Sequence, residues 1–342
     1  MSYDYSKETE VLAPVTHMLS QLVNADLPEG PLSALNEFID NAFGPDAGNA
    51  QAVRISYKPD MLVIDDNGQG VLNLNSLFRI GDSVSRLSRT DIGNFGYGSK
   101  VGVLYMGKHM MVQTVREGEY HAFEVDWEQV AECEQWPAPY QGKPLKFPKV
   151  KPITRGTRII IRKRHRTFQL LPLAERMAHV YGPALRDGRE ITLAHYDLAG
   201  KLQKEVKVSE LAGKTPLESV TTCSLVVNGK RVEVRAGAML ERKGRLNGVH
   251  LAFGHRVIRT ERVLSQPLPA RLYVEAKLDT AWKPCLTALK NDILTDKAEL
   301  LAAIEECLAD LIAMLHQEVQ ERRLDLITAV ERGLCRGVPE AG

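Results

Sequence analysis

The sequence lacks any apolar run that approaches the roughly 20 residues needed by a membrane-spanning helix. Its first ten residues, MSYDYSKETE, are polar and acidic, unlike a secretory signal peptide. Low-complexity segments and internal repeats are also missing. These absences argue against a protein anchored by such a helix and against a repeat protein, so we expect no membrane partner.

Cysteine is scarce, and none of the five cysteines forms a CxxC pair. They are odd in number and widely scattered, at Cys133, Cys223, Cys285, Cys307 and Cys335. This distribution predicts neither a disulfide framework nor a zinc site. We therefore expect the reducing environment of the cytoplasm.

An excess of charge is absent too, since 44 basic residues oppose 43 acidic ones and the net charge is +1. Hydrophobic residues make up 44% and charged residues 25%, which are globular values and exclude general disorder. A chain of 342 residues exceeds what one core usually supports, so two domains of roughly 150 residues are expected. Affinity for nucleic acid then depends on local clusters of charge rather than on the total.

A helix is predicted over Ala34–Ala42, where apolar residues recur at helical spacing. Glu37 and Asn41 lie four residues apart and therefore share one face, with Asp40 beside them. A carboxylate and a carboxamide are thus held side by side. Taken alone, this pattern is equally typical of a solvated helix face.

Two strands joined by a tight turn are predicted between Val53 and Ile64, and they lead into the acidic turn DDNGQG. The carboxylate of Asp66 could accept a hydrogen bond from an exocyclic amine, and Gly68 and Gly70 would let the backbone approach a flat ligand. Asp65 should point away, because successive strand residues alternate faces. An ordinary turn is the competing interpretation.

A third motif, GxxGxG, consists of Gly93, Gly96 and Gly98, and it precedes Ser99, Lys100 and an apolar stretch typical of a helix. Glycines ahead of a helix expose backbone N–H groups to an anion such as a phosphate. The segment before the motif is polar and irregular rather than a strand. A dinucleotide-binding fold is therefore disfavoured.

Together with the pair Gly156-Thr157 before an apolar strand, these motifs resemble those of the GHKL superfamily of ATPases, named for gyrase, a heat-shock chaperone, histidine kinases and MutL. The string LFRIGDSVS ahead of the glycine loop looks most like the MORC branch and its bacterial relatives. The matching residues are, in chain order, Glu37 and Asn41; Asp66, Gly68 and Gly70; Gly93, Gly96 and Gly98; and Gly156 with Thr157.

The resemblance implies an α+β protein whose N-terminal domain is a Bergerat-type sandwich of helices on a mixed sheet, with ATP and Mg²⁺ held beneath a lid. Glu37 would be the general base, and Asn41 would hold the metal. Asp66 would bind the adenine amino group with support from Thr157, while Gly68 and Gly70 would make room for it. The loop Gly93 to Gly98, with Ser99 and Lys100, would close over the phosphates, and the stretch before it would be the lid.

A second domain is expected after the first. The segment GVHLAFGHRVI, Gly248–Ile258, resembles a strand, turn and strand of the transducer domain that follows GHKL ATPase domains, although a generic hairpin also fits. Lys290 would then contact the terminal phosphate, unless it is an ordinary solvated lysine. Apolar residues spaced by three or four from Lys297 to Leu334 predict a packed C-terminal helix, with a coiled-coil or partner contact as the alternative.

The expected organisation is an ATP-binding domain over 1–168, an α/β transducer-like domain over 169–295 and a helical tail over 296–342. The leading hypothesis is an ATPase that forms a homodimer with ATP and gates action on DNA or a partner protein. The alternative is a chaperone-like or regulatory subunit that uses ATP as a conformational ligand with negligible turnover. A structural module with a vestigial site is a third hypothesis, which the intact Glu37 and Asn41 argue against. A histidine kinase is disfavoured, because only a short stretch precedes Glu37.

DNA contact is expected through Lys143 to Arg166, a segment that holds ten Lys or Arg residues and no Asp or Glu. Such a run of charge is also typical of a solvated face. Part of this one is expected to be a buried strand, Arg158 to Ile161, with alternating residues turned inward.

Overall fold

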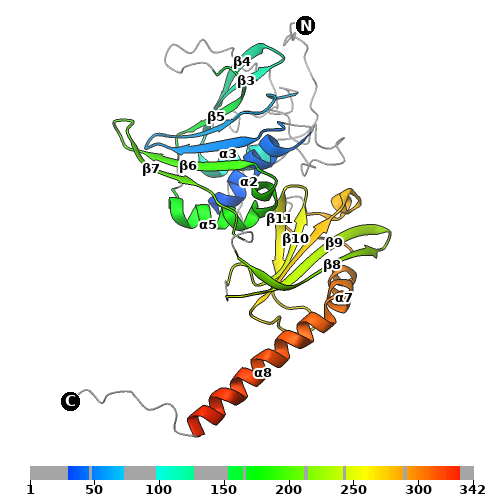
Figure 1. Ribbon diagram of the computed structural model, residues 1–342. Coiled ribbons are helices and arrows are strands. Elements are labelled where there is room, and N and C mark those ends of the chain that lie inside the picture. The colour runs from blue at the N-terminus through cyan, green and yellow to red at the C-terminus, as the bar shows by residue number, and fades with distance from the viewer. Residues whose placement is uncertain are drawn as a thin grey trace, which may run out of the picture. The chain divides into compact units, whose positions relative to one another are not determined.

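The computed structural model describes residues 30–45, 48–72, 98–126, 153–164, 167–211, 215–241, 244–287 and 291–331. They divide into two compact units, each built on its own sheet (Figure 1). The first unit contains the described residues up to Glu210 together with the turn Gly254–Arg256. The second contains the rest of the described chain from Leu211 onward. The fold is mixed α and β, as expected.

The first unit is built on a seven-stranded mixed sheet with the order β4-β3-β5-β2-β1-β6-β7. β1 and β6 are parallel, and the other neighbouring strands are antiparallel. The strands are β1 (Ala52–Tyr57), β2 (Met61–Asp66), β3 (His109–Arg116), β4 (Glu119–Asp126), β5 (Gly156–Arg162), β6 (Glu190–Tyr196) and β7 (Leu202–Lys207).

Helices pack on this sheet, and the one that matters most for the site is α2 (Pro31–Phe43). It begins with a proline, whose fixed φ suits the first helical turn, and ten of its 13 residues are buried. α3 (Gly98–Met106) crosses it closely, because a Cβ on Gly102 would lie 2.8 Å from the carbonyl oxygen of Ala34. α5 (Leu170–Val180) and α6 (Gly182–Arg186) complete the helical layer.

The expected domain boundary after residue 168 falls inside this unit. β6 pairs with β1 in parallel register from Ala52↔Glu190 to Tyr57↔His195, and β7 pairs with β6. The first sheet therefore continues to Lys207, and its unit continues to Glu210. A sequence pattern that predicts a strand does not say which sheet the strand joins.

The second unit has a five-stranded sheet with the order β11-β10-β12-β9-β8, in which β10 and β12 are parallel. A 3₁₀ helix, η3 (Thr280–Cys285), and two α-helices follow it, α7 (Lys297–Cys307) and α8 (Ala309–Glu331). The strands are β8 (Leu217–Val227), β9 (Lys230–Met239), β10 (Gly248–Phe253), β11 (Arg256–Glu261) and β12 (Leu272–Leu278).

The predicted C-terminal helix is two helices, because the first helix ends at Cys307 and the second begins at Ala309, with Leu308 between them. The apolar stripe is buried as far as Leu315, which agrees with a helix packed on its own domain. Beyond that point Val319, Leu324 and Ile327 are exposed. No helix within the described ranges combines the length and the apolar content needed to cross a membrane.

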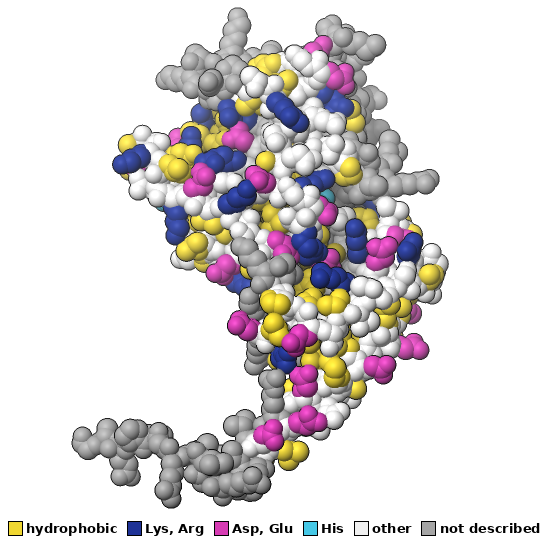
Figure 2. Space-filling model, viewed as in Figure 1, with side chains coloured by type: hydrophobic (Ala, Val, Ile, Leu, Met, Phe, Trp, Pro, Cys, Tyr) yellow, Lys and Arg dark blue, Asp and Glu magenta, His cyan; other side chains and the backbone are white. Residues whose placement is uncertain are grey.

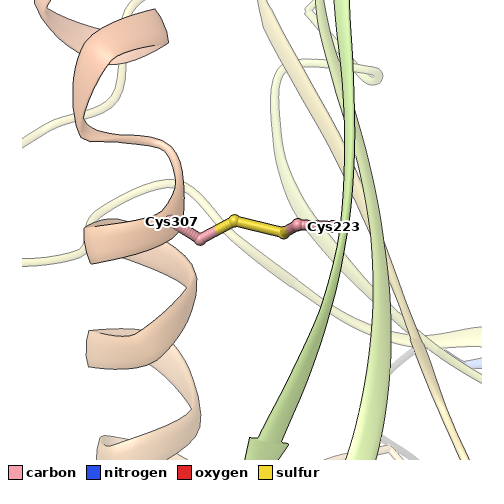
Figure 3. Close-up of a disulfide and its surroundings, with 2 residues drawn as sticks. All are labelled: Cys223 and Cys307. Atoms are coloured by element: carbon pink, nitrogen blue, oxygen red, sulfur yellow. A yellow bond between two sulfur atoms is a disulfide. The ribbon is translucent and has the colours of Figure 1, made fainter.

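A disulfide joins Cys223 on β8 to Cys307 at the end of α7, across 84 residues of sequence (Figure 3). The scattered cysteines predicted no disulfide, and this expectation was wrong for the pair. The reason is spatial, since α7 packs against β8 and brings two distant cysteines together. Cys285 is a buried free thiol.

Candidate functional site

The acidic turn after β2 is the best-defined part of the site. The antiparallel register of β2 and β5 places Asp65 opposite Arg158, so Thr157 lies beside Asp66. Oδ1 of Asp66 accepts hydrogen bonds from the backbone N–H of Gly68 at 2.9 Å and of Thr157 at 3.2 Å. Asp65 instead pairs with Arg158 at 2.5 Å. The two aspartates therefore have different partners, as their alternation along the strand predicted.

The environment of Asp66 changes its acidity. Burial raises the pKa of this carboxyl from 3.8 to about 6, and the N–H groups of Gly68 and Thr157 counter only part of the shift. The carboxylate is therefore ionised at neutral pH although it is poorly solvated. A charged acceptor in such a place binds a suitably placed donor strongly.

Thr114 extends this polar cluster and was not singled out from the sequence. It is fully buried on β3, where its hydroxyl oxygen accepts from the N–H of Val71 at 2.9 Å. The same oxygen lies 3.4 Å from the hydroxyl oxygen of Thr157 on the neighbouring strand. Its signal in the sequence was the polar pair Gln113-Thr114 directly after the apolar run Met110–Val112.

The two glycines of the turn are required by the protein's own backbone. Gly70 has a φ of +80°, and a Cβ there would lie 2.2 Å from the carbonyl oxygen of Val115. A Cβ on Gly68 would lie 2.1 Å from the carbonyl oxygen of Gly48. Close backbone packing explains both glycines, and the room they would give to a ligand stays a prediction.

Gly48 links the first two motifs, and sequence reasoning missed it. Its N–H donates to the carbonyl oxygen of Asn41 at 3.0 Å, and its own carbonyl oxygen accepts from Gln69 at 2.6 Å. A Cβ at this position would lie 2.6 Å from the carbonyl oxygen of Ala42. The loop after α2 therefore ties the end of that helix directly to the turn that carries Asp66.

Glu37 and Asn41 differ in exposure although they lie one helical turn apart on α2. Glu37 is buried, whereas Asn41 is exposed. A shielded carboxylate is suited to accept a proton, and the accessible carboxamide oxygen of Asn41 is the kind of ligand that Mg²⁺ prefers. The roles of base and metal ligand stay predictions for these two side chains.

Several predicted residues cannot be placed. Gly93, Gly96 and Lys290 lie outside the described residues, as do most of the predicted lid and the N-terminal segment. Gly98, Ser99 and Lys100 form the first turn of α3, so the predicted helix does follow the glycine motif. Nothing is described of their side chains.

Most of the basic segment Lys143 to Arg166 also lies outside the described residues, and the parts that are described make contacts within the first unit. Lys163 pairs with Asp126 at 3.0 Å. Arg164 donates to the carbonyl oxygen of Pro59 at 2.6 Å and covers the ring of Tyr57. Figure 2 shows basic and acidic side chains interspersed on the face in view, rather than one continuous basic surface.

Comparison with known proteins gives two matches. Residues 30–157 match the family model described as histidine kinase-, DNA gyrase B-, and HSP90-like ATPase. The range runs from the start of α2 to Thr157 and so includes all four motifs. ATPase morc-1 of Caenorhabditis elegans is 28% identical over 116 residues, which cover 34% of this chain and 13% of that protein. The expected resemblance to GHKL and MORC-like ATPases is confirmed.

Proposed function

With a GHKL-type ATPase domain in residues 30–157 as the premise, we propose that this protein binds ATP with Mg²⁺ and hydrolyses it. The observation that carries the proposal is the bridge made by Gly48. It holds the helix that bears Glu37 and Asn41 against the turn that bears Asp66. The backbone of Gly48 thereby connects the helix that carries the residues proposed for the phosphate end of the nucleotide to the turn that carries the residue proposed for the adenine end.

Asp66 would hold the adenine end. Its carboxylate would accept a hydrogen bond from the exocyclic amino group, while the N–H groups of Gly68 and Thr157 keep Oδ1 in place. The hydroxyl groups of Thr157 and Thr114 would complete the polar surroundings, directly or through water. A purine that carries a carbonyl oxygen at the same position would present an acceptor to a carboxylate, which favours adenine over guanine.

Glu37 and Asn41 would act at the phosphate end. Mg²⁺, when bound, supplies charge that neutralises the phosphate oxygens, and Asn41 would hold it. Glu37 would take a proton from the attacking water as the bond from that water to the terminal phosphorus forms. The bond to the bridging oxygen breaks, and ADP and phosphate leave. A positioned base of this kind contributes about 10²–10⁴-fold to a rate.

The remaining assignments are proposed on the resemblance. Gly93, Gly96 and Gly98, with Ser99 and Lys100, would cradle the phosphates, and the stretch before them would order as a lid. Lys290 would contact the terminal phosphate. These movements would bring two copies of the chain together as an ATP-dependent homodimer.

The molecule on which this ATPase cycle acts would be DNA or a partner protein. The basic segment up to Arg166 is the proposed DNA contact. DNA affinity should then fall steeply as salt rises and weaken when Arg162 to Arg166 are neutralised. Without salt-sensitive binding, a protein partner becomes the better proposal. Light scattering with a non-hydrolysable ATP analogue tests the homodimer, which fails as a proposal if the mass stays that of one chain.

Turnover and binding measured on the same variant test the enzymatic proposal. Glu37→Ala should bind a fluorescent ATP analogue as the parent chain does but lose hydrolysis by at least about 10²-fold. Asp325→Ala, at an exposed position on α8, serves as the control and should change neither quantity. Normal turnover by Glu37→Ala would contradict the assignment. Binding without turnover in the parent chain would favour the regulatory alternative.

A further inference from the structure

A buried charge cluster surrounds Asp40 on α2, the helix that also carries Glu37 and Asn41. The carboxylate of Asp40 is 4% exposed. Its Oδ1 lies 3.0 Å from Nε2 of His255 and accepts from the hydroxyl group of Tyr181 at 3.2 Å. Its Oδ2 lies 3.3 Å from Nε of Arg256. Three side chains from two separate segments therefore converge on one helical carboxylate.

Two of these partners come from a distant part of the sequence. His255 is 215 residues away from Asp40 and lies in the turn between β10 and β11. This turn, Gly254–Arg256, belongs to the first unit, although most of both strands belongs to the second. The carbonyl oxygen of His255 accepts from the N–H of Ala184, which fixes the turn beside α6. Phe43 at the end of α2 packs edge-on against the ring of His255.

Arg256 holds α2 at a second point. When the side-chain amide of Asn36 is oriented so that both its nitrogen and its oxygen have hydrogen-bond partners, its Oδ1 accepts from Nη1 of Arg256 at 2.8 Å. Asn36 and Asp40 are one helical turn apart on the same face of α2. One hydrogen bond to Asn36 and one ion pair with Asp40 therefore hold the helix at two points through a single guanidinium.

The hydroxyl group of Tyr181 is the remaining hydrogen-bond donor to Asp40. Burial, and next the negative charge of Asp40, raise the pKa of Tyr181 well above its ordinary value. Its hydroxyl group therefore stays protonated and remains a donor. Oη of Tyr181 also lies 3.3 Å from the carbonyl oxygen of Asn36.

Stability alone does not account for this cluster. Buried ion pairs lose most of their Coulomb energy to desolvation, and apolar side chains of similar volume often stabilise a fold as well. What a cluster of charged and hydrogen-bonded groups adds is direction, because its donors and acceptors fit in one arrangement only. Here the arrangement fixes the helix that carries Glu37 and Asn41.

We propose that Asp40, His255 and Arg256 are positioning residues for ATP hydrolysis. They set the rotation of α2 about its axis and so direct Glu37 and Asn41, which lie three residues before and one residue after Asp40. The inference rests on the proposed function, because that function assigns the roles of those two side chains. None of the three positioning residues is required to touch the nucleotide.

His255→Phe in the full chain is the test variant. It keeps an aromatic ring against Phe43 and Tyr181 but removes the nitrogen that faces Asp40. His250→Phe is the matched control, because His250 is also buried and holds two hydrogen-bond partners, Thr260 and the carbonyl oxygen of Leu246. Both variants lose a buried hydrogen-bonding histidine from neighbouring parts of one hairpin.

Four measurements separate positioning from stability. In His255→Phe we expect the α2 amides to exchange with solvent about tenfold faster, and kcat to fall by about tenfold or more. The gain in nucleotide affinity that Mg²⁺ provides should shrink about tenfold, because it depends on Asn41. Affinity for ADP without Mg²⁺, which depends on Asp66, should stay within about twofold. His250→Phe should leave all of these unchanged even where its unfolding temperature falls equally.

His255→Gln retains a side-chain N–H and should restore most of each loss. If His255→Phe does not fold, Tyr181→Phe removes a single donor and should shift the same three quantities in the same direction. Equal behaviour of His255→Phe and His250→Phe in amide exchange and in the Mg²⁺ effect would overturn the inference.

The failure of this inference and the failure of the proposed function are distinguishable. Hydrolysis at the parental rate by Glu37→Ala would contradict the proposed function. Amide exchange in α2 would then still decide whether the turn fixes the helix. Normal exchange and normal turnover in His255→Phe, with an inactive Glu37→Ala, would sink the positioning role alone.

Discussion

The backbone N–H of Thr157 donates a hydrogen bond of 3.2 Å to Oδ1 of Asp66, across 91 residues of sequence. This bond joins the first residues of β5 to the last residue of β2. It connects the second and fourth motifs of the chain. The position of the carboxylate is therefore fixed by the sheet rather than by its own turn alone.

Asp66→Asn should separate binding from stability. An amide oxygen can still accept from Gly68 and Thr157, and the burial of a charge is removed. We expect ATP affinity to fall by at least about tenfold, while the unfolding temperature at pH 7.5 stays equal or rises. Calorimetric titration and thermal denaturation check the two halves. Asp65→Asn is the control, since it loses the ion pair with Arg158 but should keep ATP affinity.

Nucleotide binding should depend on pH through Asp66. Its pKa is raised to about 6, so the carboxyl group gains a proton and stops accepting from an amine as the pH falls through this value. We expect the dissociation constant for ADP without Mg²⁺ to rise below about pH 6 and to be flat from pH 7 to 8. A fluorescence titration across this range checks it. A dissociation constant that does not change between pH 5 and 8 would contradict the assignment of Asp66 to the adenine.

The same shift has a consequence for stability with a defined sign. The folded chain holds the proton of Asp66 more tightly than the unfolded chain, in which the pKa is near 3.8. The contribution of Asp66 to the free energy of unfolding therefore decreases as pH rises from about 4 to about 6, and it is constant above that. Urea denaturation of the parent chain and of Asp66→Asn should diverge over this window, with the difference growing toward pH 6.

Gly48→Ala should damage the site through the backbone. The added Cβ would lie 2.6 Å from the carbonyl oxygen of Ala42, so the loop must move away from α2. We expect a loss of about 2 kcal/mol or more in the free energy of unfolding, together with weaker ATP binding. Gly244→Ala is the matched control, because a Cβ there meets nothing within 4 Å, and the change should stay within about 0.5 kcal/mol. Equal stability of the two variants would contradict the role given to Gly48.

The disulfide should be visible as a thiol count. Cys223 and Cys307 pair, so at least two more thiols should react in denaturant with a reductant than without one. Reduction frees a loop of 84 residues, which should lower the free energy of unfolding by about 4 kcal/mol. Cys285→Ser is the control, because that buried thiol is unpaired and its loss should leave the effect of reductant unchanged. Equal thiol counts with and without reductant would contradict the bond.

The sequence was informative where structure is local. The helix over Ala34–Ala42 and the hairpin over Val53–Ile64 were recognisable, because apolar spacing and a short turn depend on neighbouring residues only. The different directions of Asp65 and Asp66 followed from the pleat of one strand. Nothing in these predictions required knowledge of distant parts of the chain.

Other features could not be predicted because they arise from pairs far apart in sequence. Thr114 joins the site only because β3 lies beside β5, and β6 extends the first sheet only because it pairs with β1. Two partners of Asp40, His255 and Arg256, come from a hairpin more than 200 residues later. A periodic pattern identifies a strand and its buried face, but not its neighbours.

The turn Gly254–Arg256 determines whether the first unit can be produced as a separate fragment. A fragment that ends at Glu210 would contain the whole seven-stranded sheet and yet not the whole first unit. Asp40 would remain in the helix without the imidazole and the guanidinium that face it. We therefore expect α2 to be less well ordered in such a fragment than in the full chain. The first unit is compact in space but is not one continuous piece of chain.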